Sequence, residues 1–466
     1  MSGTKVFSAV VLLVGLITSG GCALDAGPSI SGAVPATSVG GVPAGEANDA
    51  LDAVMAGNAQ AISSAPSLVP AGAPLAPFIE ARLYAISTIA IHDALNAIVP
   101  RFERYADTGP IERNAGIAAA VLTAAHDAIV GADPGAQPAT DAWYATAISS
   151  HQGTTGFDEG VALGHRVAAA ILANRANDGT AGGGVAPYTP GTSPGDYQFT
   201  FPFNTPGFDF FGTGGFADAS MWAASVAPFG VLSTSQFRAP RPYGALTNSM
   251  AVQTQQYTND FNEVKALGCA GCTERTAEQT EIALFWVENS PTGWNRIAGV
   301  IAQQRRLDAW DTARLLAMVQ IGQFDSYACN FDSKYFYNFW RPVSAVALAD
   351  NDGNPGTSSA AGWEVLAFPT PPVPDYPSAH SSAGGAAAAI IEALLPGRGR
   401  SFTITSGSLP GVSRTFATVD DAARENGMSR VYVGFHFRTA VNAGIELGRE
   451  VGSYVARNSL KPLAKQ

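Results

Sequence analysis

The chain has 466 residues, of which 46% are hydrophobic and only 14% are charged. It can therefore bury a large core, and its composition excludes an intrinsically disordered protein. The formal net charge is −11, and no run of Lys or Arg gives the basic footprint that nucleic-acid binding needs. An acidic chain that binds an anion must gather its few cations locally.

Residues 1–23 are typical of an export signal, in which Lys5 precedes an apolar stretch over residues 6–17 and a run of small residues. The apolar stretch is too short to span a bilayer, and no later segment reaches the length of a membrane helix. We expect a cleaved signal peptide and a mature protein that is periplasmic or secreted. The alternative is a lipoprotein attached through Cys22, which follows Gly20-Gly21.

The next segment, residues 24–75, is rich in Ala, Gly, Pro and Ser. Because it shows little periodicity, we expect a flexible arm with one short helix near residues 48–61. Apolar residues then recur at helical spacing in four stretches, over residues 78–98, 115–130, 139–149 and 160–176. Between residues 177 and 243 the composition shifts to Gly, Pro, Phe and Asn. This composition predicts a long, packed loop that forms a lid or the entrance to a pocket.

Helical patterning resumes near residue 249 and gives three further stretches, at residues 278–289, 295–335 and 436–457. Two short β-type runs, 402–405 and 415–417, predict a hairpin around Pro410-Gly411. The predicted fold is therefore all-α: a helical bundle with long loops and one small β-hairpin. We expect residues 76–245 to hold the N-terminal helices and the loop. Residues 246–460 form a C-terminal helical domain, packed with the preceding part as one unit.

Cysteine and two of the histidines are best explained structurally. Cys269 and Cys272 form a C-x-x-C pair, and a disulfide is favoured over a redox pair or a zinc half-site because no second pair supplies the other two zinc ligands. Cys329 lies in an apolar helical stretch and is expected to be a buried thiol. His92 and His126 each precede Asp on an apolar helix, which predicts hydrogen-bonded core histidines.

A first candidate for anion binding is the aromatic segment that contains Lys334 and Arg341. Their spacing is close to two helical turns, which would put both cations on one face of a helix that ends or kinks at Pro342. Two unpaired cations among Tyr, Phe and Trp are costly to bury, so an anion between them is favoured. The alternative is that both side chains reach out to solvent.

A second candidate is the segment over residues 374–382, which precedes an Ala-rich helical stretch. Pro377 and Ser378 are typical of a helix start, where free backbone N–H groups and the helix dipole attract anions. Ser378 can add a hydroxyl donor, and His380 can titrate near neutral pH. The alternative is that Ser378 only caps the helix.

The third candidate is the segment around Arg430 and His436, with Gly434 just before the last predicted helix. That arrangement places His436 near a helix N-terminus and Arg430 on the segment leading to it. Arg suits bidentate contact with a tetrahedral oxyanion, and a neutral imidazole nitrogen can attack phosphorus or ligate a metal. A lone His in such a position is more often structural.

In order, these segments read Lys-x6-Arg-Pro, Pro-Ser-x-His and Ser-Arg-x3-Gly-x-His. The ordered triplet resembles the superfamily of vanadium-dependent haloperoxidases and type 2 phosphatidic acid phosphatases. The sequence of residues 337–342 looks especially like that of the bacterial haloperoxidase branch. Residues 92–97 and 283–286 extend the resemblance over most of the mature chain.

The resemblance implies a helical bundle of the haloperoxidase and acid phosphatase type, with vanadate as cofactor and His436 as the vanadium ligand. It implies that the vanadate oxygens are held by Lys334, Arg341, Ser378, Arg430 and the backbone N–H of Ala379. Lys334, His380 and His436 would carry the catalysis, with His380 as the acid–base group. Hydrogen peroxide and halide would be the substrates and hypohalous acid the product. An organic halogen acceptor and a homo-oligomer are left open.

The same pocket could serve an exported acid phosphatase that needs no cofactor. His436 would then form a phosphohistidine and His380 would protonate the leaving group. A third reading is a helical protein that only binds phosphate. Two positions depart from the superfamily pattern: Ala379 stands where Gly is usual, and Ala440 stands where an Asp that could orient His436 is common. The missing Asp favours vanadate binding over phosphohistidine chemistry.

Overall fold

The computed structural model describes residues 42–69, 75–180, 189–205, 225–397 and 401–464. The predicted signal peptide, Cys22 and part of the predicted arm lie outside these ranges. Within them, no helix combines the length and the hydropathy that crossing a membrane requires.

The fold is all-α, as the sequence predicts. Its first half contains α1 (Ala44–Ser64), η1 (Ala65–Leu68), α2 (Pro77–Ile98), α3 (Ile117–Ala132), η2 (Pro134–Ala136), α4 (Gln137–Ser149), α5 (Phe157–Arg175), η3 (Pro242–Gly244), α7 (Asn248–Ala251) and α8 (Gln255–Leu267). The second half contains α9 (Ala277–Phe285), α10 (Ser290–Arg305), α11 (Ala309–Tyr337), α12 (Pro342–Leu348), η4 (Ala349–Asn351), α13 (Ala379–Leu394), α14 (Val419–Tyr432) and α15 (Arg438–Asn458). The predicted hairpin is confirmed as antiparallel strands β1 (Phe402–Thr405) and β2 (Ser413–Phe416).

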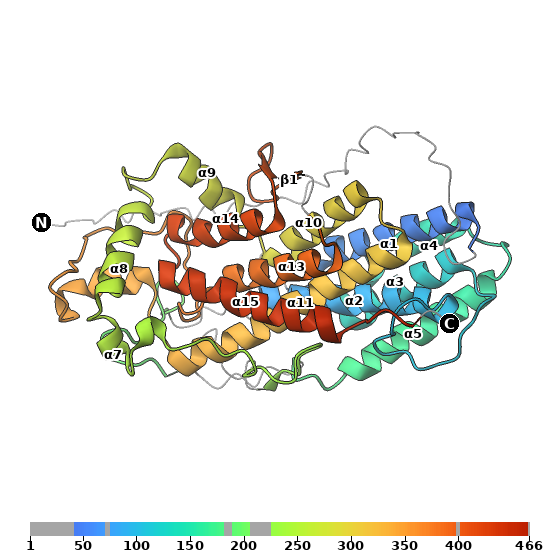
Figure 1. Cartoon of the computed structure of the whole chain (residues 1–466), viewed down its shortest axis with the longest axis horizontal. Coiled ribbons are helices and arrows are strands. Elements are labelled where there is room, and N and C mark those ends of the chain that lie inside the picture. Colours follow the sequence, from blue (N-terminus) through green and yellow to red (C-terminus); the bar gives the residue numbers. More distant parts are fainter. Residues whose placement is uncertain (1–41, 70–74, 181–188, 206–224, 398–400, 465–466) are drawn as a thin grey trace, which may run out of the picture.

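Long helices run along the molecule and share one core (Figure 1). Helix α13 packs along α15, while α11 packs against both α13 and α2. One cluster of buried apolar side chains extends from α1 to α15 and includes Trp294 and Trp310. The N-terminal helices and the C-terminal helices therefore stabilise each other by burying the same apolar surface.

The expectation of a flexible arm is wrong for residues 44–64, which form the 21-residue helix α1. Its buried face includes Ala50 and Val54, and the Asn58 amide donates to Asn295 Oδ1 at 2.7 Å. An Ala-rich segment has a weak apolar pattern, yet Ala has the highest helix propensity, and small residues let helices approach closely. The predicted short helix over residues 48–61 lies inside α1.

The predicted continuous helix over residues 295–335 is two helices, α10 and α11. Arg306 adopts a left-handed conformation with φ 53° and ends α10. Asp308 then caps α11 by accepting from the Asp311 backbone N–H at 3.0 Å. Apolar periodicity continues through the turn, so the Asp cap was the local signal for the break.

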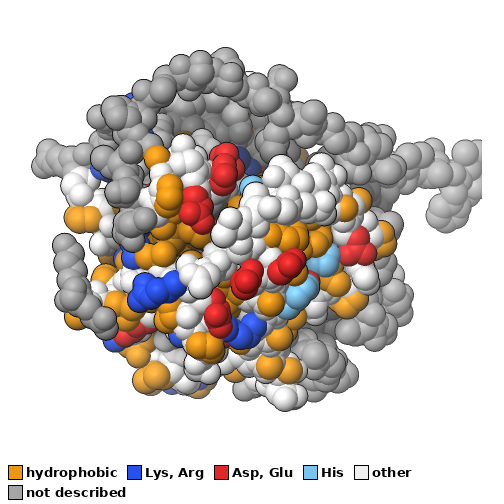
Figure 2. All heavy atoms as spheres, turned by 90° about the vertical axis from the view of Figure 1, so that its right-hand side faces the viewer, with side chains coloured by type: hydrophobic (Ala, Val, Ile, Leu, Met, Phe, Trp, Pro, Cys, Tyr) orange, Lys and Arg blue, Asp and Glu red, His pale blue; other side chains and the backbone are white. Residues whose placement is uncertain are grey.

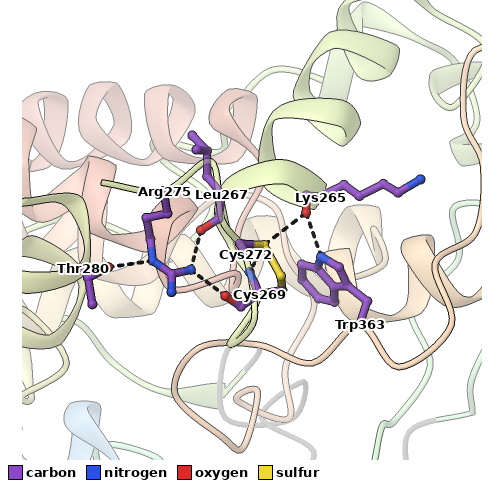
Figure 3. Close-up of a disulfide and its surroundings, with 7 residues drawn as sticks. All are labelled: Lys265, Leu267, Cys269, Cys272, Arg275, Thr280 and Trp363. Carbon is purple, nitrogen blue, oxygen red and sulfur yellow. Dashed lines mark hydrogen bonds between the residues drawn. A yellow bond between two sulfur atoms is a disulfide. The ribbon is translucent and has the colours of Figure 1, made fainter. Parts of the chain in front are cut away.

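The disulfide prediction is confirmed, and Cys269 and Cys272 close a turn after α8 (Figure 3). The Arg275 guanidinium donates to the carbonyls of Leu267 and Cys269. This turn lies against the segment before α15, because a Cβ on Gly268 would come within 2.6 Å of Gly434 Cα. Cys329 is a buried free thiol in α11, as expected.

His92 is buried in α2 with its Nδ1 3.1 Å from Asp93 Oδ1, which confirms the prediction for this histidine. His126 instead lies at the surface of α3, where its two ring nitrogens are each 2.8 Å from a carboxylate, that of Asp127 and that of Asp141 on α4. Figure 2 shows histidine side chains directly beside acidic ones on this end of the molecule. His165 on α5 contacts Asp127 as well.

The His126 contacts predict a pH-dependent contribution to stability. Hydrogen bonding to Asp127 and Asp141 raises the pKa of His126 above its usual value. A raised folded-state pKa gives stability that is fully present below about pH 6.5, the unfolded value, and is lost as pH rises through the folded-state pKa. We therefore expect His126→Gln to lower the free energy of unfolding more at mildly acidic pH than at alkaline pH.

Urea unfolding of the parent and of His126→Gln across that range checks this. His151→Gln serves as the control, because His151 shows no side-chain hydrogen bond among the described residues. A penalty for His126→Gln that does not change with pH would contradict the expectation.

Candidate functional site

The three candidate segments meet where five helices begin or end. Lys334 lies in the last turn of α11, Arg341 precedes α12, and Ser378 precedes α13. Arg430 lies in the last turn of α14, and His436 lies two residues before α15. These five residues are at most 4% exposed, while Ala379 and His380 are partly exposed. The structure therefore gathers every predicted site residue.

Lys334 and Arg341 do not share a helical face, so that part of the prediction is wrong. Helix α11 ends at Tyr337, and Asn338 turns the chain with a φ of 52°. The residues after Asn338 run extended against the described part of the long loop. There the backbone N–H of Trp340 donates to the Gly195 carbonyl at 2.8 Å. Arg341 is the residue that precedes α12. Tertiary contact, rather than helical spacing, brings the two cations together.

Both cations hold the same short segment, residues 373–375. Lys334 Nζ donates to the carbonyls of Pro374 and Asp375 at 2.6 and 2.9 Å. Arg341 Nε donates to the Val373 carbonyl at 2.7 Å. Burial lowers the pKa of Lys334 well below its usual value, and the nearby Arg341 charge lowers it further. An anion between the two side chains would offset this unfavourable charge.

Arg430 belongs to α14, rather than to the lead-in segment that the sequence suggested. Its Nε donates to Ser429 Oγ at 2.9 Å and its Nη2 to the Trp286 carbonyl at 2.7 Å. Its Nη1 is buried and has no hydrogen-bond partner among the described residues. Burial lowers the pKa of Arg430 to about 9. A buried donor of this kind suits the oxygen of a bound oxyanion.

The start of α13 follows the prediction, with Ser378 at the N-cap. The Ser378 hydroxyl accepts from Ser381 Oγ at 2.8 Å, which leaves its own proton to donate. The first backbone N–H groups of α13, at Ala379 and His380, have no partner within the helix. This end of α13 can therefore supply several neutral donors to one anion.

His380 is positioned by a backbone carbonyl. Its Nε2 lies 3.2 Å from the Glu288 carbonyl oxygen, and because a carbonyl only accepts, Nε2 carries the proton. Burial and the neighbouring Arg430 charge lower the pKa of His380 well below its usual value. His380 is therefore neutral at neutral pH, with Nδ1 free to accept a proton.

His436 lies between an acid and a cation. Its Nδ1 is 2.9 Å from Asp375 Oδ1, and its Nε2 is 2.9 Å from Arg341 Nη1. Burial and the surrounding cations, Arg341 first among them, lower the pKa of His436 well below its usual value. Burial raises the pKa of Asp375 to about 7, against the opposing effect of Arg341 and Lys334.

Asp375 is the site residue that the sequence reasoning missed. Position 440 supplies no carboxylate to His436, but Asp375 Oδ1 lies 2.9 Å from its Nδ1. The segment before α13 packs against the first turn of α15, where Ser378 N–H donates to the Ala440 carbonyl at 2.9 Å. That packing brings Asp375 to His436. Its only local signal was an acid just before Tyr376-Pro377-Ser378 in a site otherwise built from cations.

A known protein family matches the part of the chain that carries the candidate site. Residues 314–464 match the family model described as the VCPO second helical-bundle domain. Over 254 residues the chain is 25% identical to vanadium chloroperoxidase of Curvularia inaequalis, and the match spans 41% of either chain. These matches support the vanadium haloperoxidase family for this chain, most directly over residues 314–464.

Solved structures of bacterial vanadium haloperoxidases share the fold. The first bacterial vanadium-dependent iodoperoxidase superposes with a TM-score of 0.71 at 21% identity, covering 90% of this chain and 98% of that one. The apo form of a bacterial vanadium-dependent chloroperoxidase superposes with a TM-score of 0.65 at 19% identity, covering 83% and 95%.

The haloperoxidase family match contains all the candidate site residues from Lys334 to His436. The upstream segments of the resemblance have structural roles here. Asp93 accepts from the backbone N–H groups of residues 105–107, and the Trp286 carbonyl holds Arg430.

Proposed function

We propose that this protein is a vanadate-dependent haloperoxidase that oxidises halide with hydrogen peroxide to hypohalous acid. Three buried cations, Lys334, Arg341 and Arg430, gather around the imidazole of His436 and support this function most directly. The one buried carboxylate in contact with that imidazole among the described residues is Asp375, so the site carries an excess of positive charge. Such a preorganised site stabilises a tetrahedral oxyanion.

The residues present fit vanadate. His436 Nε2 would coordinate the metal, since its other ring nitrogen faces Asp375. Lys334, Arg341 and Arg430 would neutralise the oxygens, and Arg430 Nη1 has no competing partner among the described residues. The Ser378 hydroxyl and the Ala379 N–H would add neutral donors. When bound, vanadate supplies the Lewis acidity that activates hydrogen peroxide for attack by halide.

His380 would handle the proton. Its Nε2 proton is held by the Glu288 carbonyl, so Nδ1 is the nitrogen that can accept a proton from incoming hydrogen peroxide. The overall reaction consumes one proton, because hydrogen peroxide, halide and H⁺ give hypohalous acid and water. A neutral His380 can take the proton from peroxide and return it to the departing water.

A phosphomonoesterase on the same site is the second candidate. The contact between Asp375 and His436 Nδ1 favours it more than the sequence did, because a carboxylate makes an imidazole a better nucleophile at Nε2. Phosphate would occupy the position proposed for vanadate. The haloperoxidase remains first because the family relatives are named as haloperoxidases.

The proposal is tested by loading the protein with orthovanadate and supplying hydrogen peroxide with chloride, bromide or iodide and a halogen-accepting dye. We expect bleaching of the dye that falls at least about 100-fold in His436→Ala. His151→Ala, an exchange of a histidine outside the site, is the matched control. Thermal unfolding of both variants shows whether they remain folded.

If no halide gives bleaching above the level of His436→Ala, the haloperoxidase proposal fails. Vanadate-sensitive release of phosphate from p-nitrophenyl phosphate would then support the phosphatase. Stabilisation by inorganic phosphate without either activity would support the phosphate-binding protein.

A further inference from the structure

We infer that Asp375 is a positioning residue that fixes the tautomer and orientation of His436, in place of the acidic residue that is missing at position 440. The inference deepens the proposed function, since it rests on His436 being the residue that holds the oxyanion. Asp375 comes from the segment before α13, whereas position 440 lies in the first turn of α15.

The two neighbours of the imidazole determine where its proton sits. Arg341 Nη1 is 2.9 Å from His436 Nε2 but 3.4 Å from Nδ1. A guanidinium can only donate, so the nitrogen it contacts must present its lone pair. Asp375 Oδ1 is 2.9 Å from the other nitrogen, Nδ1, a charge contact in which neither carboxylate oxygen makes a hydrogen bond among the described residues. The ionised carboxylate favours the proton on Nδ1, and the shorter Arg341 contact favours the lone pair on Nε2.

Asp375 is itself held on both sides, as a positioning residue must be. Its backbone N–H donates to the Phe339 carbonyl at 2.8 Å, and its carbonyl accepts from Lys334 Nζ at 2.9 Å. The side chain is only 1% exposed. Isolated burial of a carboxylate is costly, and the charges of Arg341 and Lys334 and the contact with His436 offset that cost for Asp375.

Ala440 lies beside the segment that carries Asp375. It is 1% exposed, and its carbonyl accepts from Ser378 N–H at 2.9 Å, so the first turn of α15 lies directly beside the segment that carries Asp375. Position 440, in the first turn of α15, follows His436 by four residues, so we expect an Asp side chain there to reach the imidazole. A carboxylate transferred from 375 to 440 should restore the contact from the other side.

The experiment uses Asp375→Ala, Asp375→Asn and the double variant Asp375→Ala/Ala440→Asp in the full-length protein. The tautomer of His436 in the ligand-free protein is read by NMR of ¹⁵N-labelled histidine, with His436→Gln to assign the signal. Binding of orthovanadate and of inorganic phosphate is measured by equilibrium dialysis. Asp352→Ala, at another buried Asp that caps a loop and has no contact with His436 among the described residues, is the matched control.

We expect Asp375→Ala to lose the pure Nδ1–H tautomer and to weaken orthovanadate binding about 10- to 100-fold. Asp375→Asn should lose less, since its amide oxygen can still accept from Nδ1, and the double variant should regain both the tautomer and most of the affinity. Asp352→Ala should leave the tautomer unchanged.

An unchanged tautomer in Asp375→Ala overturns the inference, as does a loss of affinity that neither Asn nor the double variant recovers. These readouts need no haloperoxidase activity. If the parent protein does not oxidise halide, the proposed function fails. The tautomer of His436 still shows whether Asp375 positions the imidazole.

Discussion

Replacing Arg430 with Met is expected to lower the vanadate-dependent rate of halide oxidation by about 100- to 1000-fold. The buried Nη1 of Arg430 has no hydrogen-bond partner among the described residues. Its removal therefore takes away a donor that we expect to bind the anion. Arg430→Lys should recover little, because a compact ammonium does not reproduce the separate Nε and Nη2 donors that contact Ser429 and the Trp286 carbonyl and leave Nη1 for an oxyanion. Initial rates and orthovanadate affinity measure the effect.

The matched control is Arg424→Met on the same helix, α14. Arg424 pairs with Asp420 at 2.7 Å, but its side chain is 64% exposed. Exposed ion pairs contribute about 0–1 kcal/mol to stability, so this variant should keep its rate. Equal losses in both variants would show that α14 responds to any change of charge, and no loss in Arg430→Met would remove Arg430 from the site.

Replacing Gly448 with Ala is expected to lower the free energy of unfolding by about 3 kcal/mol, the upper part of the range for overpacking. A Cβ at this position in α15 would lie 2.0 Å from the Ser382 carbonyl oxygen of α13. The clash is with backbone, which cannot rotate away as a side chain can. A Cβ added at Gly444 or at Gly452 would likewise lie 2.4 Å from a backbone oxygen, that of Ser378 at the N-cap of α13 or that of Ala386 within it.

The substitution should also weaken orthovanadate binding, because α13 begins at the Ser378 cap and α15 follows His436. The control is Gly45→Ala, at a helical glycine in α1 with no atom near the added Cβ. It should be neutral or stabilise by up to about 1 kcal/mol. Chemical denaturation compares the two variants, and equal stabilities would contradict close packing of α15 on α13.

Short-range signals allowed the sequence to predict much of the fold. Helix α2 was predicted from its apolar spacing, the start of α13 from Pro377-Ser378, and the hairpin from the turn at Pro410-Gly411. Helix α1 was predicted only in part, as a short helix near residues 48–61, because its Ala-rich face gives a weak pattern and burial of Ala depends on what packs against it. The disulfide was predictable because its two cysteines are near neighbours in the chain.

The sequence by itself determined which residues form the candidate site: the cations Lys334, Arg341 and Arg430, with His380 and His436. Their identities and order are set by the chain. Only the tertiary structure decided how they meet. The left-handed turn at Asn338 ends the helix that carries Lys334, so Arg341 lies on the next element. Packing of the segment before α13 on α15 brings Asp375 to His436. Caps and turns arise from neighbouring residues and are visible locally, whereas a contact between two distant segments depends on how helices pack.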